Sequence, residues 1–203
     1  MNMKKVAPVI SYLFHPLVMP TLGLLLLLNS GTYISLLDPA AKRAILFVMA
    51  LGTFIFPLIM MPILYYRNLV SNLQNASREE RLIPHLIILI LYIITFIYFA
   101  RLPLSRVIHS YVLSVAIALF VLLILNLRYK VCIHTAALGG LTGLIIALIA
   151  LFDTPLQGIL ILTLLAGGIS GSARLAIGAN SSGEIYTGFL LGFGVVLTTV
   201  LVY

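Results

Sequence analysis

Residues 135–152 read TAALGGLTGLIIALIALF, an apolar run without a charged side chain. A helix needs about 20 apolar residues to cross the ~30 Å hydrocarbon core of a bilayer, so this run predicts a membrane-spanning helix. Its glycines, Gly139, Gly140 and Gly143, are spaced so that a neighbouring helix can approach closely. The stretch therefore favours a bundle of helices packed against one another within a membrane.

Comparable runs recur along the chain, at residues 9–29, 43–66, 84–100, 107–127 and 184–203, with a shorter one at 155–170 that extends toward Arg174. Hydrophobic residues make up 62% of the chain and charged residues 8%, whereas about a quarter of the residues of a soluble domain are charged. We predict an all-α, polytopic membrane helix bundle of six to seven transmembrane helices, in one domain over residues 1–203.

The first run has two features of a signal peptide, since Lys4 and Lys5 precede an apolar stretch. No small-residue cleavage site follows, however, and Pro16 and Pro20 interrupt the run. We therefore expect a retained helix that is kinked or preceded by an interfacial turn.

These spans place the segments 67–83, 128–134 and 171–183 on one face of the membrane. The opposite face receives residues 30–42, 101–106 and 152–155. Basic residues number eight on the first face and four on the second, but half of the eight are candidate ligands, so the positive-inside rule does not orient the chain.

The net charge of +7 rests on only 12 lysines and arginines among long apolar runs. It indicates interfacial anchors and an anion site rather than a nucleic-acid surface. A single cysteine, Cys132, excludes an intramolecular disulfide framework. No metal or cofactor site is predicted.

Two basic clusters lie on the first face. Arg78 and Arg81 are three residues apart and share one face of a helix, where two guanidinium groups form a fork-shaped anion site. The alternative is a solvated helix start, neutralised by neighbouring glutamates.

In the second cluster, Lys130 precedes His134, whose imidazole is able to protonate a leaving oxygen. The alternative is that His134 is an interfacial polar group, as a lone histidine at a membrane edge usually is.

Arg174 supplies a third basic group, within the apolar stretch 169–177. An arginine at such depth costs at least a few kcal/mol and rarely lacks a partner or bound anion. Glu184 is its expected protein partner and phosphate its expected ligand, with a purely structural ion pair left open.

The spacing Arg174-x5-Asn180-x3-Glu184 resembles Arg-x5-His-x3-Asp, the third signature of the type 2 phosphatidic acid phosphatase superfamily. The order of the three basic clusters on one face is also similar to that of the superfamily. The stretch 14–21, FHPLVMPT, resembles the opening of its short bacterial members.

The resemblance implies a membrane-embedded phosphatase for a phospholipid or isoprenyl pyrophosphate, acting through a phosphohistidine without a cofactor, at the periplasmic face of a bacterial inner membrane. Its implied partners are the bilayer and a phosphorylated lipid. The implied roles are general acid for His134, orienting carboxylate for Glu184, and phosphate binding for Arg78, Arg81, Lys130, Cys132 and Arg174.

Several positions depart from the family pattern. Gln74 stands where the first signature has lysine, and Leu82 where it has proline. Cys132 occupies the position of a phosphate-contacting serine. The decisive departure is Asn180, which occupies the position of the nucleophilic histidine, because an amide nitrogen cannot attack phosphorus.

Three alternatives follow from Asn180. The chain is a non-catalytic binder of lipid phosphates, or Asn180 replaces the histidine of an active enzyme, or His85 serves as a relocated nucleophile. A hypothesis from another functional class is a small transporter or scaffold whose basic residues are anchors. Transporters often contain an internal repeat, and none is visible in this sequence.

Overall fold

The apolar runs fold as helices because the bilayer interior offers no water to satisfy the backbone. The computed structural model describes residues 3–66 and 82–203, and within these ranges all regular elements are helical. In chain order they are α1 (Met3–Leu13), α2 (Met19–Leu28), the short 3₁₀ helix η1 (Tyr33–Leu36), α3 (Pro39–Ala50), the π-helical segment η2 (Leu51–Ile55), α4 (Phe56–Tyr66), α5 (Leu82–Ala100), α6 (Arg106–Asn126), α7 (Ile133–Phe152), α8 (Gln157–Ala176) and α9 (Ser182–Val202). The predicted helical fold class is confirmed.

Six helical spans are long and apolar enough to cross a membrane, among the residues that the structure describes. They are Pro39–Ile63, which joins α3, η2 and most of α4, and the helices α5, α6, α7, α8 and α9. The run expected at 155–170 is a full-length helix that continues through Arg174 to Ala176. The architecture is that of an integral membrane protein.

The first predicted span, residues 9–29, is not one helix. It is divided into α1, which ends at Leu13, and α2, which begins at Met19. Pro16 lies in the break and Pro20 in the first turn of α2, where proline is tolerated because its missing N–H would have no intrahelical partner. At 10 residues, α2 rises only about 15 Å, too short to cross the bilayer. The kink that the prolines predict is therefore a complete interruption.

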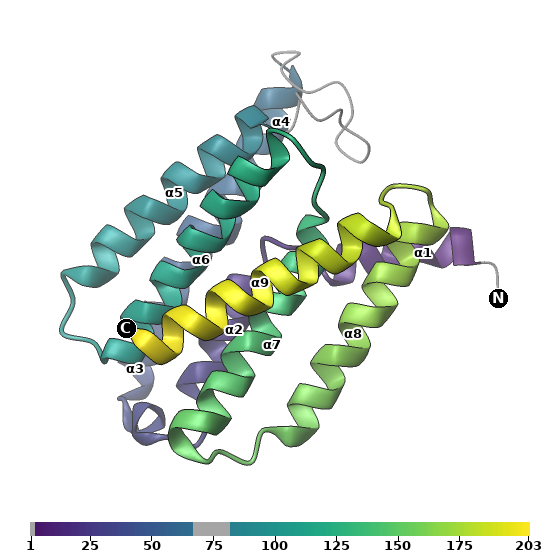
Figure 1. The fold of residues 1–203 in the computed structure, drawn as a ribbon. Coiled ribbons are helices and arrows are strands. Elements are labelled where there is room, and N and C mark those ends of the chain that lie inside the picture. The colour runs from purple at the N-terminus through teal and green to yellow at the C-terminus, as the bar shows by residue number, and fades with distance from the viewer. Residues whose placement is uncertain (1–2, 67–81) are drawn as a thin grey trace.

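α7 lies at the centre of the bundle and α9 crosses it closely (Figure 1). The two backbones touch where glycine removes the side chain. A Cβ on Gly139 would collide with the carbonyl of Phe189, and a Cβ on Gly192 with the carbonyl of Ala136. Small residues allow this approach in membranes, where packing rather than the hydrophobic effect joins helices. The close contact predicted for the 135–152 helix is confirmed.

The connections between helices gather at two ends of the bundle. Figure 1 shows the α6–α7 and α8–α9 connections toward one end, and the α2–α3, α5–α6 and α7–α8 connections toward the other. This is the alternation that the predicted spans require. It brings residues 127–132 and 177–181 to the same end.

The α7–α9 contact yields a stability prediction. A Cβ at Gly188 would meet the carbonyl of Cys132 and lie 2.8 Å from Thr135 Oγ1. We expect Gly188→Val to lower the free energy of unfolding by at least ~1–3 kcal/mol, the usual cost of overpacking. Thermal unfolding in detergent measures the change.

Gly194 provides the matched control on the same helix, because nothing lies within 4 Å of a Cβ built there. We expect Gly194→Val to unfold at nearly the temperature of the unmodified protein. Equal unfolding temperatures for the two variants would contradict a tight contact between α7 and α9.

Candidate functional site

Arg174, Asn180 and Glu184 form one hydrogen-bonded chain. Arg174 Nε donates to Asn180 Oδ1 at 3.1 Å, and Asn180 Nδ2 donates to Glu184 Oε2 at 2.6 Å. Arg174 and Asn180 are 7% and 5% exposed. The three residues are therefore joined directly, and Arg174 and Asn180 are largely shielded from solvent.

A tight reversal of the chain produces this contact. α8 ends at Ala176, and Gly178 follows with a φ of +67°, a left-handed conformation that glycine adopts without strain. The Ala179 N–H then donates to the Arg174 carbonyl at 3.0 Å, which satisfies an acceptor in the last turn of α8. The Ser181 side chain caps α9 by accepting from the Glu184 N–H.

Asn180 suits its position because its two polar atoms match two different partners. Arginine offers only donors and an ionised glutamate only acceptors. The amide oxygen must therefore face Arg174 and the amide nitrogen must face Glu184. A neutral imidazole also carries one acceptor and one donor, so a histidine at position 180 could satisfy the same two partners.

Lys130 joins this chain from the α6–α7 connection. Its Nζ donates to the Ala179 carbonyl at 2.7 Å and lies 3.8 Å from Glu184 Oε2. The backbone continues the contact, since the Cys132 N–H donates to the Glu184 carbonyl at 3.1 Å. Lys130 of the second predicted cluster therefore meets the third cluster, although residues far apart in sequence supply them, whereas His134 contacts His15.

The cluster carries an excess of positive charge. Lys130 and Arg174 contribute two cations and Glu184 one anion. Within residues 3–66 and 82–203, the Arg174 guanidinium makes one hydrogen bond, from Nε, and no carboxylate lies within ion-pairing distance of it. The direct Arg174–Glu184 pair expected from the sequence is not formed, because Asn180 lies between the two and Glu184 pairs with Lys130.

His134 lies in the first turn of α7, next to a histidine that the sequence analysis left out of the site. The rings of His15 and His134 meet edge to face, with their centroids 6.2 Å apart. His15 Nδ1 accepts from the Leu17 N–H at 3.4 Å, which places the proton of a neutral ring on Nε2. Burial lowers the pKa of His15 below its usual value of 6.5, so this ring is neutral at pH 7.

The remaining predicted ligands are placed differently. The Cys132 thiol is buried, at 1% exposure, and the residue forms the N-cap of α7. Arg78 and Arg81 lie outside the described residues, so the first cluster stays a prediction. No group of three or more potential metal-ligating side chains occurs in the part of the chain that the structure describes.

The missed residue, His15, had one signal in the sequence. A histidine directly before Pro16 interrupts an otherwise apolar run, and a proline break exposes polar groups that a continuous helix would not. Nothing in the neighbouring sequence indicated that the break would bring His15 beside His134.

Comparison of the chain with protein-family models, curated proteins and solved structures finds no match.

The double contact of Asn180 yields a second prediction. Asn180→Leu leaves the Arg174 Nε–H and Glu184 Oε2 without their shared partner, and an unsatisfied buried polar group costs about 1–3 kcal/mol. We expect a lower unfolding temperature for this variant, and a smaller loss for Asn180→His, which keeps one donor and one acceptor.

Asn29, the C-cap of α2, is a suitable control because it is exposed and its side chain makes one hydrogen bond among the described residues, to the Leu25 carbonyl of that helix. We expect Asn29→Leu to leave the unfolding temperature almost unchanged. If Asn180→Leu were equally harmless, Asn180 would not join Arg174 to Glu184 in solution.

Proposed function

We propose that the chain is a membrane-embedded lipid phosphatase in architecture, which binds the phosphate of a lipid and is impaired in cleaving it because Asn180 replaces the nucleophile. The buried guanidinium of Arg174 carries this proposal. Four of its five N–H donors have no partner among the described residues. A phosphate oxygen is the type of acceptor that a guanidinium fork binds most strongly.

The surroundings of Arg174 favour an anion. Lys130 adds a second positive charge, and Glu184 neutralises only one of the two. The first turns of α7 and α9 adjoin through the bond from Cys132 to Glu184, and the N-terminal ends of helices attract negative charge. Because the site lies where the spans end, a phosphate reaching it can belong to a lipid whose chains stay in hydrocarbon.

The family mechanism, carried over by position, assigns a role to each group. A histidine at position 180 would attack phosphorus through one ring nitrogen, once Arg174 has turned from that nitrogen to the phosphate, while the N–H of its other ring nitrogen donates to Glu184. The P–O bond would break, His134 would give a proton to the departing oxygen, and water would then cleave the N–P bond. Asn180 removes the attacking lone pair, and loss of a nucleophile typically costs several orders of magnitude in rate.

One observation favours a non-catalytic binder of lipid phosphates as the second candidate. The amide of Asn180 accepts from Arg174 Nε and donates to Glu184 Oε2 at the same time, so asparagine is a well-matched residue in its own right. Its presence does not require a disrupted site. For either candidate, the resemblance favours a phospholipid or isoprenyl pyrophosphate at the periplasmic face of a bacterial inner membrane.

The binding half of the proposal is tested with Arg174. We expect Arg174→Ala to weaken binding of phosphatidate in nanodiscs by ~2–5 kcal/mol, the cost of removing one partner from a buried charge pair. Arg174→Gln, which keeps a polar side chain but removes the charge and the terminal N–H donors, should lose most of the same affinity. Titration against phosphatidylcholine discs measures the part that depends on the phosphomonoester.

Arg101→Ala is the control, since Arg101 is exposed at the opposite end of the bundle. It should leave phosphatidate binding unchanged. Unaltered binding in both Arg174 variants, with their unfolding temperatures preserved, would assign Arg174 to a structural role and overturn the proposal.

The catalytic half is tested by restoring the nucleophile. We expect Asn180→His to release phosphate from a short-chain phosphatidate or an isoprenyl pyrophosphate, since Glu184 is positioned to hold the new imidazole. Adding His134→Gln should then abolish the release by removing the acid. Phosphate release is measured against the unmodified protein at equal lipid occupancy.

The outcomes separate the candidate functions. Release with histidine at position 180 and little without it indicates an enzyme impaired by asparagine. Binding without release in both proteins indicates a non-catalytic binder. The absence of both binding and release would favour a transporter or scaffold.

A further inference from the structure

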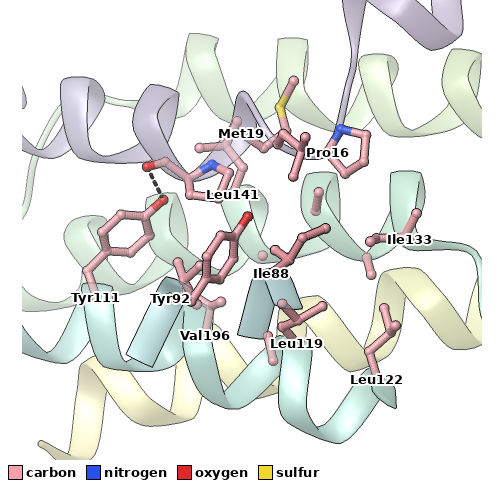
Figure 2. A pocket seen from close by; sticks show the side chains of 17 residues that line it. Pro16, Met19, Ile88, Tyr92, Tyr111, Leu119, Leu122, Ile133, Leu141 and Val196 are labelled. Carbon is pink, nitrogen blue, oxygen red and sulfur yellow. Dashed lines mark hydrogen bonds between the residues drawn. The ribbon is translucent and has the colours of Figure 1, made fainter. Parts of the chain in front are cut away.

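A cavity of about 80 Å³ lies inside the helix bundle. Figure 2 shows its lining, which comes from α2 and the turn before it and from α5, α6, α7 and α9. The lining residues include Pro16, Met19, Ile88, Leu122, Ile133 and Val196. Helices far apart in the sequence therefore enclose one space.

The walls of the cavity are almost wholly apolar. The only polar side chains among the described residues that line it are those of Tyr92 and Tyr111. Tyr111 Oη donates to the Pro20 carbonyl at 2.9 Å, and Tyr92 Oη lies 3.5 Å from the Thr53 carbonyl. Because no charged or metal-ligating side chain among the described residues lines the space, it suits a hydrocarbon rather than an ion or a polar headgroup.

The cavity is about one bilayer leaflet deep. On α7 its lining extends from Ile133 to Leu141 and on α6 from Leu122 to Tyr111, which at 1.5 Å per residue correspond to about 12 and ~16 Å. The hydrocarbon core of a bilayer is ~30 Å thick, so the lining is about as long as half of that core. A lipid chain of one leaflet has a similar length.

The end of the cavity that Pro16 and Ile133 line adjoins the candidate functional site. Pro16 directly follows His15, and Ile133 directly precedes His134, and both line the cavity. In Figure 2 these two residues lie at one end, together with Leu122, while Tyr111 lies at the other. The His15–His134 contact therefore borders this end of the apolar space, and Cys132, directly before Ile133, bonds to Glu184 of the charged cluster.

We infer that this cavity holds one hydrocarbon chain of the lipid whose phosphate binds beside Arg174. The inference rests on the proposed function and adds to it a chain-binding site within the bundle. A volume of about 80 Å³ admits part of a single chain, so any second chain of the lipid stays in the surrounding bilayer. The protein would then recognise both the phosphate and one hydrocarbon chain of the lipid.

Photo-crosslinking in nanodiscs tests this placement. A phosphatidate with a diazirine near the middle of one chain is compared with a diacylglycerol that carries the same chain without phosphate. Mass spectrometry of the irradiated protein maps the modified residues. We expect phosphatidate to label the cavity walls, such as Ala118, Leu119 and Leu141, more strongly than diacylglycerol does.

A filling variant makes the test specific. Ala137 lines the cavity from α7, whereas Ala150 is exposed on the same helix and does not line it. We expect Ala137→Leu to reduce labelling of the walls about tenfold, equivalent to ~1.4 kcal/mol, and Ala150→Leu to leave it unchanged. Ala118→Leu fills the same space from α6 and should reproduce the loss if Ala137→Leu fails to fold.

Two outcomes overturn different statements. If Arg174-dependent phosphatidate binding is intact but labelling is confined to lipid-facing residues such as Ile90 and Phe120, the cavity inference is wrong and the proposed function stands. If the walls are labelled equally by both lipids and Arg174 does not affect binding, the proposed function is wrong, and with it the link between cavity and phosphate.

Discussion

The direct approach of the α7 and α9 backbones is the constraint on which the candidate site depends. Glycines at the crossing let carbonyl groups of one helix lie where side chains would otherwise keep the helices apart. Only at that separation does the Cys132 N–H reach the Glu184 carbonyl. This bond fixes the α6–α7 connection against the start of α9, so that Lys130 meets the Arg174–Asn180–Glu184 chain. In a bilayer, such packing has to come from shape because lipid supplies little hydrophobic drive between helices.

Asn180 presents one acceptor and one donor to the two groups beside it, a match that mere loss of a catalytic histidine would not require. The residue joins a donor-only group to an acceptor-only group, and histidine could do the same in its neutral form. The geometry is thus compatible with a phosphohistidine enzyme and with a permanent binder. What differs between the two is the ring nitrogen of histidine, whose lone pair can attack phosphorus when it is not accepting from Arg174. The positive charge and burial of Arg174 would suit either function.

The candidate site and the internal cavity differ sharply in polarity. Charged groups gather where the helices end, and the apolar space begins at the neighbouring residues, Pro16 and Ile133. This arrangement keeps the guanidinium near the interface, where burying it costs less than at the bilayer centre. The interruption between α1 and α2 contributes to both halves. It brings His15 to His134 and Pro16 to the cavity.

The sequence by itself determined the helices and the local part of the site. Hydropathy predicts spans because each segment must satisfy its own backbone in lipid, and Asn180 meets Glu184 because Asn180 lies in the turn directly before α9 and Glu184 in the first turn of that helix. Only the tertiary structure decided that Lys130 pairs with Glu184, that His15 lies beside His134, and that the helices enclose a cavity. These contacts join segments distant in sequence. Their apolar surfaces are nearly interchangeable in composition, so their pairing is selected by the fit of small residues, which hydropathy does not encode.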